Sequence, residues 1–415
     1  MADDHRDEHR YRRARVDEQV WREARARGLS RRRFLQWLAA TAALTAPAAT
    51  ALARLRTAQA APSPAELVVK PTPADLFNDF GSNREMRWEA MAARGYLVPN
   101  ELFFVRNHTR TPRLDAATWR LRVEGSGVTR AVDVSYEDLL NLPPVSVIRY
   151  IECAGNGRSF FEATYGRRAS GTQWKLGAVG VAEWTGVRLR DVLERAGLKR
   201  TAVDVMPEGL DDLKVRRPMA LAKAMEDDTL LVYAMNGQIL PPDHGFPVRV
   251  LVPGWIGVAN VKWLGRLEVS EQPLFSPWNT DSYVLIGDAY KPVGPSKGPV
   301  LTTQSLKSAF ELPWDGEIRP GRRAIRGRSW SPFGRITKVE VSVDRGITWQ
   351  PATLREPNIA KAWVRWDLPW DARPGSYGLR ARATDEQGNG QPAIVPFNEQ
   401  GYLFNAVVSH PITVR

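Results

Sequence analysis

The pattern of apolar residues changes near residue 300, and this change constrains the fold more than any other feature of the sequence. From about residue 101 to 285, short apolar strands alternate with helical stretches, one of which begins with a capping box formed by Ser135 and Asp138. After about residue 300, apolar residues alternate at period two between Gly, Pro and Asn turns. The first pattern is typical of an α+β domain, and the second is typical of an immunoglobulin-like antiparallel β-sandwich.

The individual elements that these patterns predict are as follows. Helices are expected over 188–196, where Gly197 ends the helix, and over 218–225. Strands are expected over 119–123, 145–151, 230–235, 248–252, 336–343, 363–367, 377–383 and 406–408. Residues 61–100 are rich in proline and predict an irregular arm. The chain after residue 60 is too long for one ordinary core, so we expect two domains, over 101–295 and 296–415.

The first 60 residues predict an export signal. Residues 1–29 are densely charged and are expected to be disordered. Three arginines, Arg31 to Arg33, then precede an uncharged stretch, and Ala58-Gln59-Ala60 fits a small-residue cleavage site. A permanent membrane anchor would need about 20 strongly apolar residues, and this stretch is shorter and weakly apolar. We therefore expect export by the twin-arginine pathway to the periplasm or another extracytoplasmic space, and favour cleavage near Ala61 over anchoring.

The net charge of +12 overstates how basic the exported chain would be. Residues 1–60 hold 13 Arg and 7 Asp or Glu, so they contribute 13 − 7 = +6, half of the total. The remainder contains neither a Lys/Arg-rich run nor a nucleic-acid-binding motif, and we expect no nucleic-acid partner. The remaining excess suits arginines that hold an anionic cofactor and an anionic substrate.

Cys153 is the only cysteine of the 415 residues. A single sulfur can form neither an internal disulfide nor a metal site of several thiolates. Cys153 follows an expected strand and precedes Gly155 and Gly157, which allow the backbone to approach a ligand closely. Arg158 then places a permanent cation near the sulfur. The alternative is a buried thiol that packs as a small apolar side chain, and spacing alone favours neither.

The run Cys153-Ala154-Gly155-Asn156, followed by Arg158, resembles the molybdenum-ligand motif of the sulfite oxidase family. Four further runs occur in the order of that family: Phe-Val-Arg-Asn-His at 104–108, Glu-Gly-Leu-Asp at 208–211, Asp-His-Gly-Phe-Pro-Val-Arg at 243–249 and Val-Lys-Trp-Leu at 261–264. The resemblance extends from about residue 95 to the end. It implies a molybdopterin-binding domain over 101–295, an immunoglobulin-like dimerisation domain over 296–415, and a homodimer.

The resemblance also implies a molybdenum cofactor with one pyranopterin, whose metal takes Cys153 as its protein ligand. A soft thiolate suits such a metal. The cofactor contacts that it implies are Phe104, Val105, Arg106, Asn107, His108, Asp211, His244, Arg249, Asn260, Val261 and Lys262. Arginine and lysine can neutralise a phosphate, while histidine and aspartate can bond to pterin rings. Considered alone, His244 is more typical of packing in a turn before Pro247, and Lys262 of a solvated charge on a strand; only the matched runs favour cofactor contacts.

On the substrate side, the resemblance implies a cationic pocket for the small anion sulfite. Arg106 and Arg158 match two substrate arginines, and Trp174 matches a tryptophan about twenty residues after the cysteine, although a purely structural Trp174 is an alternative. Tyr283 matches a catalytic tyrosine by its spacing and is expected to assist proton transfer. The chain departs from the animal enzymes at Gln400, which stands where they carry a further arginine before a glycine.

The function that we expect is oxidation of sulfite to sulfate. The chain has no Cys-x-x-Cys-His motif, so we expect no haem on it and an external electron acceptor such as a c-type cytochrome; direct use of oxygen is open. The first alternative is a sulfane-sulfur dehydrogenase acting on carrier-bound sulfur, because Gly157 before Arg158 resembles the cysteine loop of those enzymes. A reductase of oxidised methionine and a binding protein with a decayed cofactor site are further alternatives. The sandwich argues against the former, and the retained motifs argue against the latter.

Overall fold

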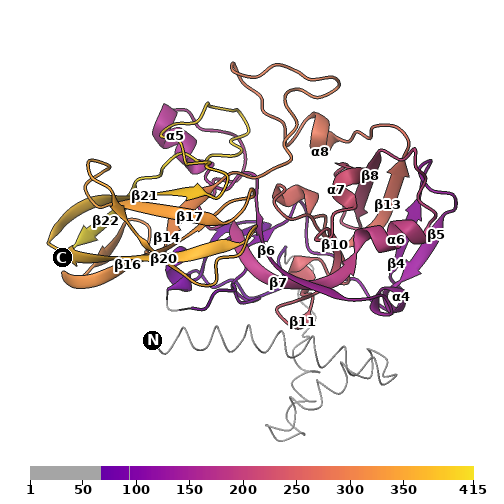
Figure 1. Cartoon of the computed structure of the whole chain (residues 1–415), viewed down its shortest axis with the longest axis horizontal. Helices are drawn as coiled ribbons and strands as arrows, with labels where there is room; N and C mark the ends of the chain where they lie inside the picture. The colour runs from indigo at the N-terminus through magenta and orange to yellow at the C-terminus, as the bar shows by residue number, and fades with distance from the viewer. Residues whose placement is uncertain (1–66, 93) are drawn as a thin grey trace, which may run out of the picture.

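The computed structural model describes residues 67–92 and 94–415 (Figure 1). The predicted export signal and its cleavage site lie outside the described residues. In Figure 1 the C-terminal strands form a sandwich at the left, and most of the earlier strands and short helices lie at the right; α5 (Ser159–Tyr165) is at the upper left. The expected α+β class with a C-terminal β-sandwich is confirmed. No helix within the described residues is long and apolar enough to cross a membrane.

The segment after residue 66 is more ordered than we expected. It forms a three-stranded sheet of β1 (Phe77–Phe80), β2 (Asn83–Met86) and β3 (Val105–Arg106), with a 3-10 helix η1 (Trp88–Met91). The prediction of an irregular arm over 61–100 is therefore wrong for residues 77–91. Gly81 makes the hairpin possible, because it adopts φ = 73° and donates its N–H to Asp79 Oδ1 at 2.8 Å. Pairing of β2 with β3 places Asn83 opposite Arg106.

Two five-stranded sheets form the centre of the N-terminal part. The first contains β6 (Val145–Glu152), β7 (Val179–Arg188), β10 (Leu230–Met235), β11 (Gln238–Ile239) and β12 (Arg249–Leu251); the second contains β4 (Arg120–Glu124), β5 (Val132–Ser135), β8 (Asp204–Gly209), β9 (Met219–Ala220) and β13 (Leu264–Ser270). Their orders are β11-β10-β7-β6, with β12 beside β10, and β5-β4-β13-β8-β9. The strands expected in this part are thus confirmed, with ends that shift by a few residues.

Short helices connect these strands. They are α4 (Tyr136–Leu140), α5 (Ser159–Tyr165), α6 (Leu189–Arg195), α7 (Leu221–Ala224) and α8 (Pro277–Thr280), with 3-10 helices η2 (Pro242–His244) and η3 (Gly257–Ala259). The predicted capping box is present, because Ser135 Oγ accepts the N–H of Asp138 while the Asp138 carboxylate accepts the N–H of Ser135. Helix α6 buries Leu189, Val192 and Leu193 in the core of the second sheet.

The C-terminal part is a sandwich of two sheets. The first sheet has the order β14 (Lys307–Phe310), β16 (Gly321–Trp330), β20 (Trp363–Ala372) and β19 (Thr353–Arg355). The second sheet has the order β15 (Gly316–Ile318), β22 (His410–Val414), β21 (Gly375–Asp385), β17 (Ile336–Ser342) and β18 (Gln350–Pro351). The strand expected over 406–408 is wrong, and the last strand is β22. Ala406 is buried, and the N–H of Val407 bonds to the carbonyl of Pro392, so this run packs as a loop without a strand ladder.

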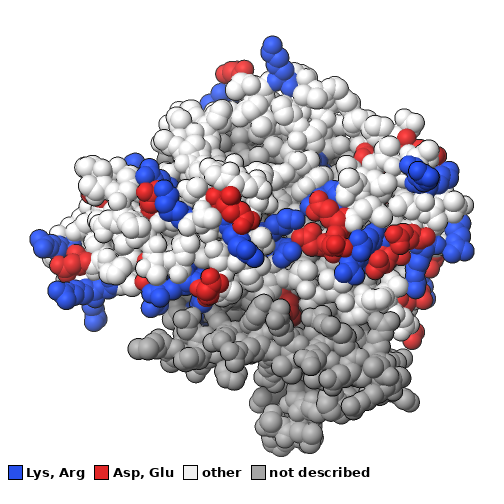
Figure 2. Space-filling view, viewed as in Figure 1, with Lys and Arg blue, Asp and Glu red and all other residues white. Residues whose placement is uncertain are grey.

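The two parts share one apolar cluster. Tyr150 and Cys153 lie in the same buried cluster as Ala309, Trp330 and Trp363. Trp88 joins them, because its ring centroid lies 6.0 Å from that of Trp330 and 5.9 Å from that of Trp363. The end of β6 that carries Cys153 therefore lies where the sandwich meets the N-terminal sheets. On the face shown in Figure 2, acidic and basic side chains are interspersed.

Candidate active site

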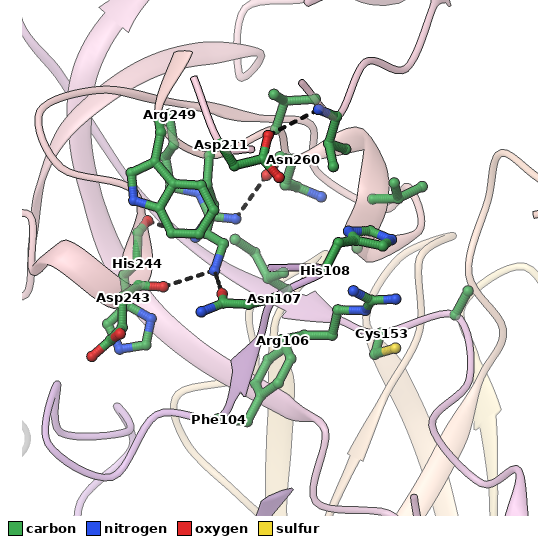
Figure 3. A pocket seen from close by; sticks show the side chains of 18 of the residues that line it. Phe104, Arg106, Asn107, His108, Cys153, Asp211, Asp243, His244, Arg249 and Asn260 are labelled. Atoms are coloured by element: carbon green, nitrogen blue, oxygen red, sulfur yellow. Dashed lines mark hydrogen bonds between the residues drawn. The ribbon is translucent and has the colours of Figure 1, made fainter. Parts of the chain in front are cut away.

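A cavity lies at the end of β6, and Figure 3 shows it from close by. Among the residues predicted from the sequence, those that line it are Phe104, Arg106, Asn107, His108, Cys153, Asp211, His244, Arg249, Asn260, Val261, Lys262 and Tyr283. Phe103, Ile151, Asp243 and Trp263 are among the lining residues that were not predicted. Val105, Arg158 and Trp174 are not part of the lining. The fold thus gathers runs that are far apart in the chain around one sulfur.

Cys153 lies in a tight turn directly after β6. Its N–H donates to the carbonyl of Ala178 at 2.9 Å, and its own carbonyl accepts the N–H of Asn156 at 2.9 Å. Asn156 is fully buried, and its Oδ1 accepts the N–H of Ala178 at 3.0 Å. The thiol is buried, so this turn presents a single sulfur at the wall of the cavity.

Arg106 places its guanidinium beside that sulfur (Figure 3). Burial lowers the pKa of Arg106, but Tyr283, Cys153 and other neighbours outweigh this effect, so the pKa is raised above its usual value. The hydrogen bond between the guanidinium and the Cys153 sulfur contributes to the rise. Arg106 is therefore a permanent cation at the point where an anion in the cavity would approach Cys153.

Two more cations lie in the opposite wall of the cavity. Lys262 Nζ donates to Asn107 Oδ1 and, at 2.8 Å, to the carbonyl of Asp243. Arg249 donates from Nη1 to the carbonyl of His244 and from Nη2 to that of Asn260, both at 3.0 Å.

None of these four acceptor atoms is a carboxylate oxygen. Burial lowers the pKa of Arg249 to about 9 and that of Lys262 well below its usual value. Within the described part of the chain, the buried Arg249 Nε has no hydrogen-bond partner. Buried cations that bond only to neutral groups favour an anionic ligand such as a phosphate.

The two histidines of the lining are neutral near pH 7. Burial, and then the positive charges of Arg106 and Lys262, together lower the pKa of His108 to about 2. The pKa of His244 falls well below its usual value, first through burial and then through Lys70 and other cations. A neutral imidazole has one donor and one acceptor nitrogen, which suits the edge of a heterocycle.

Tyr283 reaches the cavity from a long loop. Its hydroxyl lies 3.2 Å from His108 Nε2, and its ring stacks on that of Tyr402 with a centroid distance of 5.1 Å and an angle of 14°. Burial raises the pKa of the Tyr283 phenol, and Arg106 partly offsets this rise. Because His108 is neutral, its tautomer sets the direction of this bond: a protonated Nε2 donates to the phenol oxygen, and an unprotonated Nε2 accepts the phenol proton. Tyr283 therefore lines the cavity, and its role in proton transfer stays a prediction.

Arg158 takes a different position from Arg106. Its Nε donates to the carbonyl of Gln400 at 2.8 Å and its Nη1 to that of Thr172 at 2.7 Å. A Cβ added at Gly155 would lie 2.4 Å from Arg158 Nη2, and one added at Gly401 would lie 2.5 Å from its Cγ. These glycines therefore make room for the arginine. Arg158 ties the cysteine turn to two other loops, and its contact with substrate stays a prediction.

Trp174 is also placed behind the cavity wall. It is buried, and its ring meets the edge of Phe80 at a centroid distance of 5.6 Å. Its carbonyl accepts the N–H of Ser159, the first residue of α5. The geometry gives Trp174 a packing role beside the cysteine turn, and its contact with substrate stays a prediction.

Sequence reasoning missed residues around the cavity. Asp243 accepts the N–H groups of Val69 and Lys70 at 2.9 and 2.8 Å, which ties the start of the described chain to the site. Asp243 directly precedes His244 in the matched run at 243–249, and this position could have predicted that it lies at the site. Arg217 is buried and donates to the carbonyls of Trp278 and Leu301 in the loop that carries Tyr283. No sequence pattern pointed to Arg217 or to Tyr402.

No group of three or more His, Cys, Asp and Glu side chains that could hold a metal ion occurs in residues 67–92 and 94–415. Cys153 is the residue of the lining that would offer a soft thiolate to a metal there. The buried cations and the empty volume beside the sulfur fit an anionic pterin cofactor.

Comparison with known proteins agrees with this arrangement. The family model described as "Oxidoreductase molybdopterin binding domain" matches residues 108–278, and that described as "Mo-co oxidoreductase dimerisation domain" matches residues 305–414. Mitochondrial sulfite oxidase of Homo sapiens is 38% identical over 336 residues, covering 76% of this chain and 61% of the human protein. Sulfite oxidase of Gallus gallus is 36% identical over 345 residues, covering 78% and 74%.

A solved structure extends the comparison to bacteria. The sulfane dehydrogenase SoxCD of Paracoccus pantotrophus superposes with a TM-score of 0.71 at 28% identity, covering 84% of this chain and 90% of that one. The chain spans about three fifths of the length of the mammalian sulfite oxidases that it matches. The identity to the chicken enzyme over most of both chains, together with the two domain matches, shows that this chain belongs to the sulfite oxidase family of molybdopterin-dependent oxidoreductases.

Proposed function

We propose that this chain oxidises sulfite to sulfate at a molybdenum ion that is bound by Cys153 and one molybdopterin. The observation that carries the proposal is the single sulfur of Cys153 next to the Arg106 cation, in a cavity whose far wall holds buried cations without carboxylate partners. When bound, the cofactor supplies two-electron redox chemistry and the transfer of one oxygen atom to sulfur.

The cofactor's place follows from the charges of the wall. Arg249 and Lys262 would hold the pterin phosphate, because both are desolvated cations with spare bonding capacity. Asn107, Asp211 and Asn260 would bond to polar atoms of the pterin rings. Cys153 would bind the metal, which places the reacting centre on the side of Arg106.

The chain's own residues then act on the substrate. Arg106 binds the anionic oxygens of sulfite and aligns them near the metal site. Tyr283 holds a proton on its phenolic oxygen. In the tautomer of His108 that carries its proton on Nε2, His108 donates to this oxygen, so the phenol proton is free to donate to an oxygen of the reacting anion. The reaction consumes one sulfite and one water, and it releases one sulfate, two protons and two electrons. The acceptor we propose is a c-type cytochrome, which takes the electrons one at a time.

The assay uses purified protein loaded with molybdenum cofactor. Sulfite should reduce a c-type cytochrome, or ferricyanide at two per sulfite, without any carrier protein. Cys153→Ser, which retains the cavity but loses the soft ligand, is the matched control and should show no more than a few per cent of the turnover. Cofactor-loaded wild-type protein that does not respond to sulfite would contradict the proposal.

A second candidate is oxidation of sulfane sulfur bound to a carrier protein. It is favoured by the similarity to the Paracoccus pantotrophus sulfane dehydrogenase and by Gln400, a neutral residue where animal members carry an arginine. Gln400 Nε2 donates to the carbonyl of Asp281 at 2.8 Å. Because its amide is neutral, Gln400 adds no positive charge to the site. Turnover with a sulfane-bearing carrier, and none with sulfite, would establish this candidate.

We also propose that the enzyme is an exported homodimer. The support is the twin-arginine run before residue 60 and the match of residues 305–414 to a dimerisation domain. Replacement of Arg31 and Arg32 by lysine should retain the enzyme in the cytoplasm, as measured by cell fractionation. Sedimentation should give twice the chain mass. Export of the double variant, or a monomeric mass, would refute the respective part.

A further inference from the structure

A fully buried ion pair lies directly behind the cysteine turn. Glu152, the last residue of β6, contacts Lys307, the first residue of β14, with 2.7 Å between Oε1 and Nζ. Their side chains are 0% and 1% exposed. Glu152 precedes Cys153 in the chain, whereas Lys307 belongs to the C-terminal sandwich. The pair therefore joins the sandwich to the residue next to the predicted metal ligand.

The atoms of this pair also bind the cysteine turn. Glu152 Oε1 accepts Asn156 Nδ2 at 2.9 Å, and Lys307 Nζ donates to the carbonyl of Asn156 at 2.9 Å. Glu152 Oε2 accepts Trp330 Nε1 at 3.0 Å, and Gln304 Nε2 donates to the carbonyl of Glu152 at 2.6 Å. Lys307, Trp330 and Gln304 all come after residue 300, so three side chains from that region hold both ends of the four-residue turn.

Stability alone does not explain such a pair. Burying two charges costs several kcal/mol per ion, and a well-packed apolar pair is often as stable or more stable. Hydrogen bonds with fixed directions, by contrast, hold a backbone in one geometry. A metal-binding side chain needs a fixed backbone, because a small displacement of its ligand atom breaks the bond to the metal.

We propose that Glu152 and Lys307 are positioning residues for Cys153, so that the C-terminal sandwich is a working part of the metal site. The proposal rests on the proposed role of Cys153 as metal ligand. It assigns to the sandwich a function besides dimerisation, namely to fix the turn that presents the sulfur to the cavity.

The chain offers a matched control for this idea. Arg328 and Glu311 form a second buried ion pair, with 2.6 Å between Nε and Oε1 and side-chain exposures of 0% and 7%. Arg328 also joins the two parts of the molecule, because it donates to the carbonyls of Tyr96 and Gly95 at 3.0 Å. None of these contacts involves the cysteine turn. Disruption of the Arg328–Glu311 pair therefore measures the effect of losing a buried ion pair between the two parts of the molecule when the contacts of the cysteine turn are intact.

The experiment uses the only thiol of the chain as a reporter. In cofactor-free full-length protein, the rate at which a thiol reagent modifies Cys153 measures how often the turn opens. Lys307→Met should raise this rate about tenfold or more, whereas Arg328→Met should leave it within about twofold of wild type even where it lowers the melting temperature as much. Glu152→Gln, nearly identical in shape, places an amide N–H against the Trp330 N–H and should also raise the rate.

The second readout is the molybdenum and pterin content after cofactor loading. Lys307→Met and Glu152→Gln should retain pterin but hold less molybdenum per pterin than Arg328→Met. Equal thiol rates in Lys307→Met and Arg328→Met would overturn the proposal, and so would an unchanged rate in Glu152→Gln. If wild type held no molybdenum, the proposed function would fail, while the thiol rates would still decide whether the pair orders the turn.

Discussion

The two arginines that match substrate contacts should respond differently to the same substitution. Arg106 hydrogen-bonds to the Cys153 sulfur and lines the cavity, whereas Arg158 donates to the carbonyls of Gln400 and Thr172. Replacing either residue by methionine removes all donors while keeping most of the side-chain length. The sequence predicts a raised KM for sulfite in both variants, but the geometry separates them.

The magnitudes follow from the contacts that are lost. A charge-assisted hydrogen bond to a bound anion contributes about 1.5–3 kcal/mol, so Arg106→Met should raise the KM for sulfite about tenfold or more at equal cofactor content. Arg158→Met leaves two partly buried carbonyls without their donor, which costs about 1 kcal/mol or more each. Its melting temperature should fall by about 4 °C or more, at roughly 2 °C per kcal/mol. Its KM should change less than that of Arg106→Met.

The assay is steady-state sulfite oxidation at fixed ionic strength, with rates expressed per molybdenum, beside thermal unfolding of the same samples. Arg106→Lys is the control variant, because it keeps the charge and should recover part of the lost affinity. An unchanged KM in Arg106→Met would refute the placement of the substrate anion beside Arg106. A larger KM effect in Arg158→Met, with an unchanged melting temperature, would show that Arg158 faces the substrate after all.

Three further predictions concern the cavity. Tyr283→Phe should lower kcat about 100-fold by removing a positioned proton donor, and stopped-flow reduction by sulfite would measure it; a normal rate would contradict the role of the phenol. Arg217→Met should move the alkaline limb that Tyr283 sets in the pH profile of kcat to higher pH. The reason is that the Arg217 cation lowers the pKa of Tyr283, against the effect of burial. A limb at the same pH or at lower pH would contradict this. The free energy of unfolding of cofactor-free protein should fall as the pH drops below about 6.5. The reason is that His108 takes up a proton in the unfolded state, whereas in the folded state its pKa of about 2 keeps it neutral. Urea unfolding should show that the free energy of unfolding depends less on pH in His108→Asn, and an equal pH dependence would exclude His108 as its source.

Local sequence patterns predicted the elements whose structure is decided locally. The capping box at Ser135 and the turn at Asn236 and Gly237 form as expected, because each depends on residues a few positions apart. Residues 406–408 show the limit of this reasoning. Their apolar character predicts a strand, but they pack beside Pro392 without a ladder, and a partner strand cannot be seen in a local pattern.

The same distinction holds for the site. The matched runs predicted most of the cavity wall, because each run carries its own side chains to the cavity. The surroundings of Arg158 were hidden, because they come from Gly155, Gly171 and Gly401, which meet only in the folded chain. Contacts between segments about 150 residues apart, such as Glu152 with Lys307, give no sequence signal without the fold.

X-ray absorption at the molybdenum edge tests whether Cys153 is the protein ligand of the metal. In cofactor-loaded wild-type protein, we expect one protein thiolate at the metal beside the two sulfurs of the dithiolene, with about one molybdenum per chain. In Cys153→Ser, the thiolate contribution should disappear while the pterin stays bound through Arg249 and Lys262. A wild-type spectrum without the thiolate, or an unchanged spectrum in Cys153→Ser, would show that Cys153 does not bind the metal.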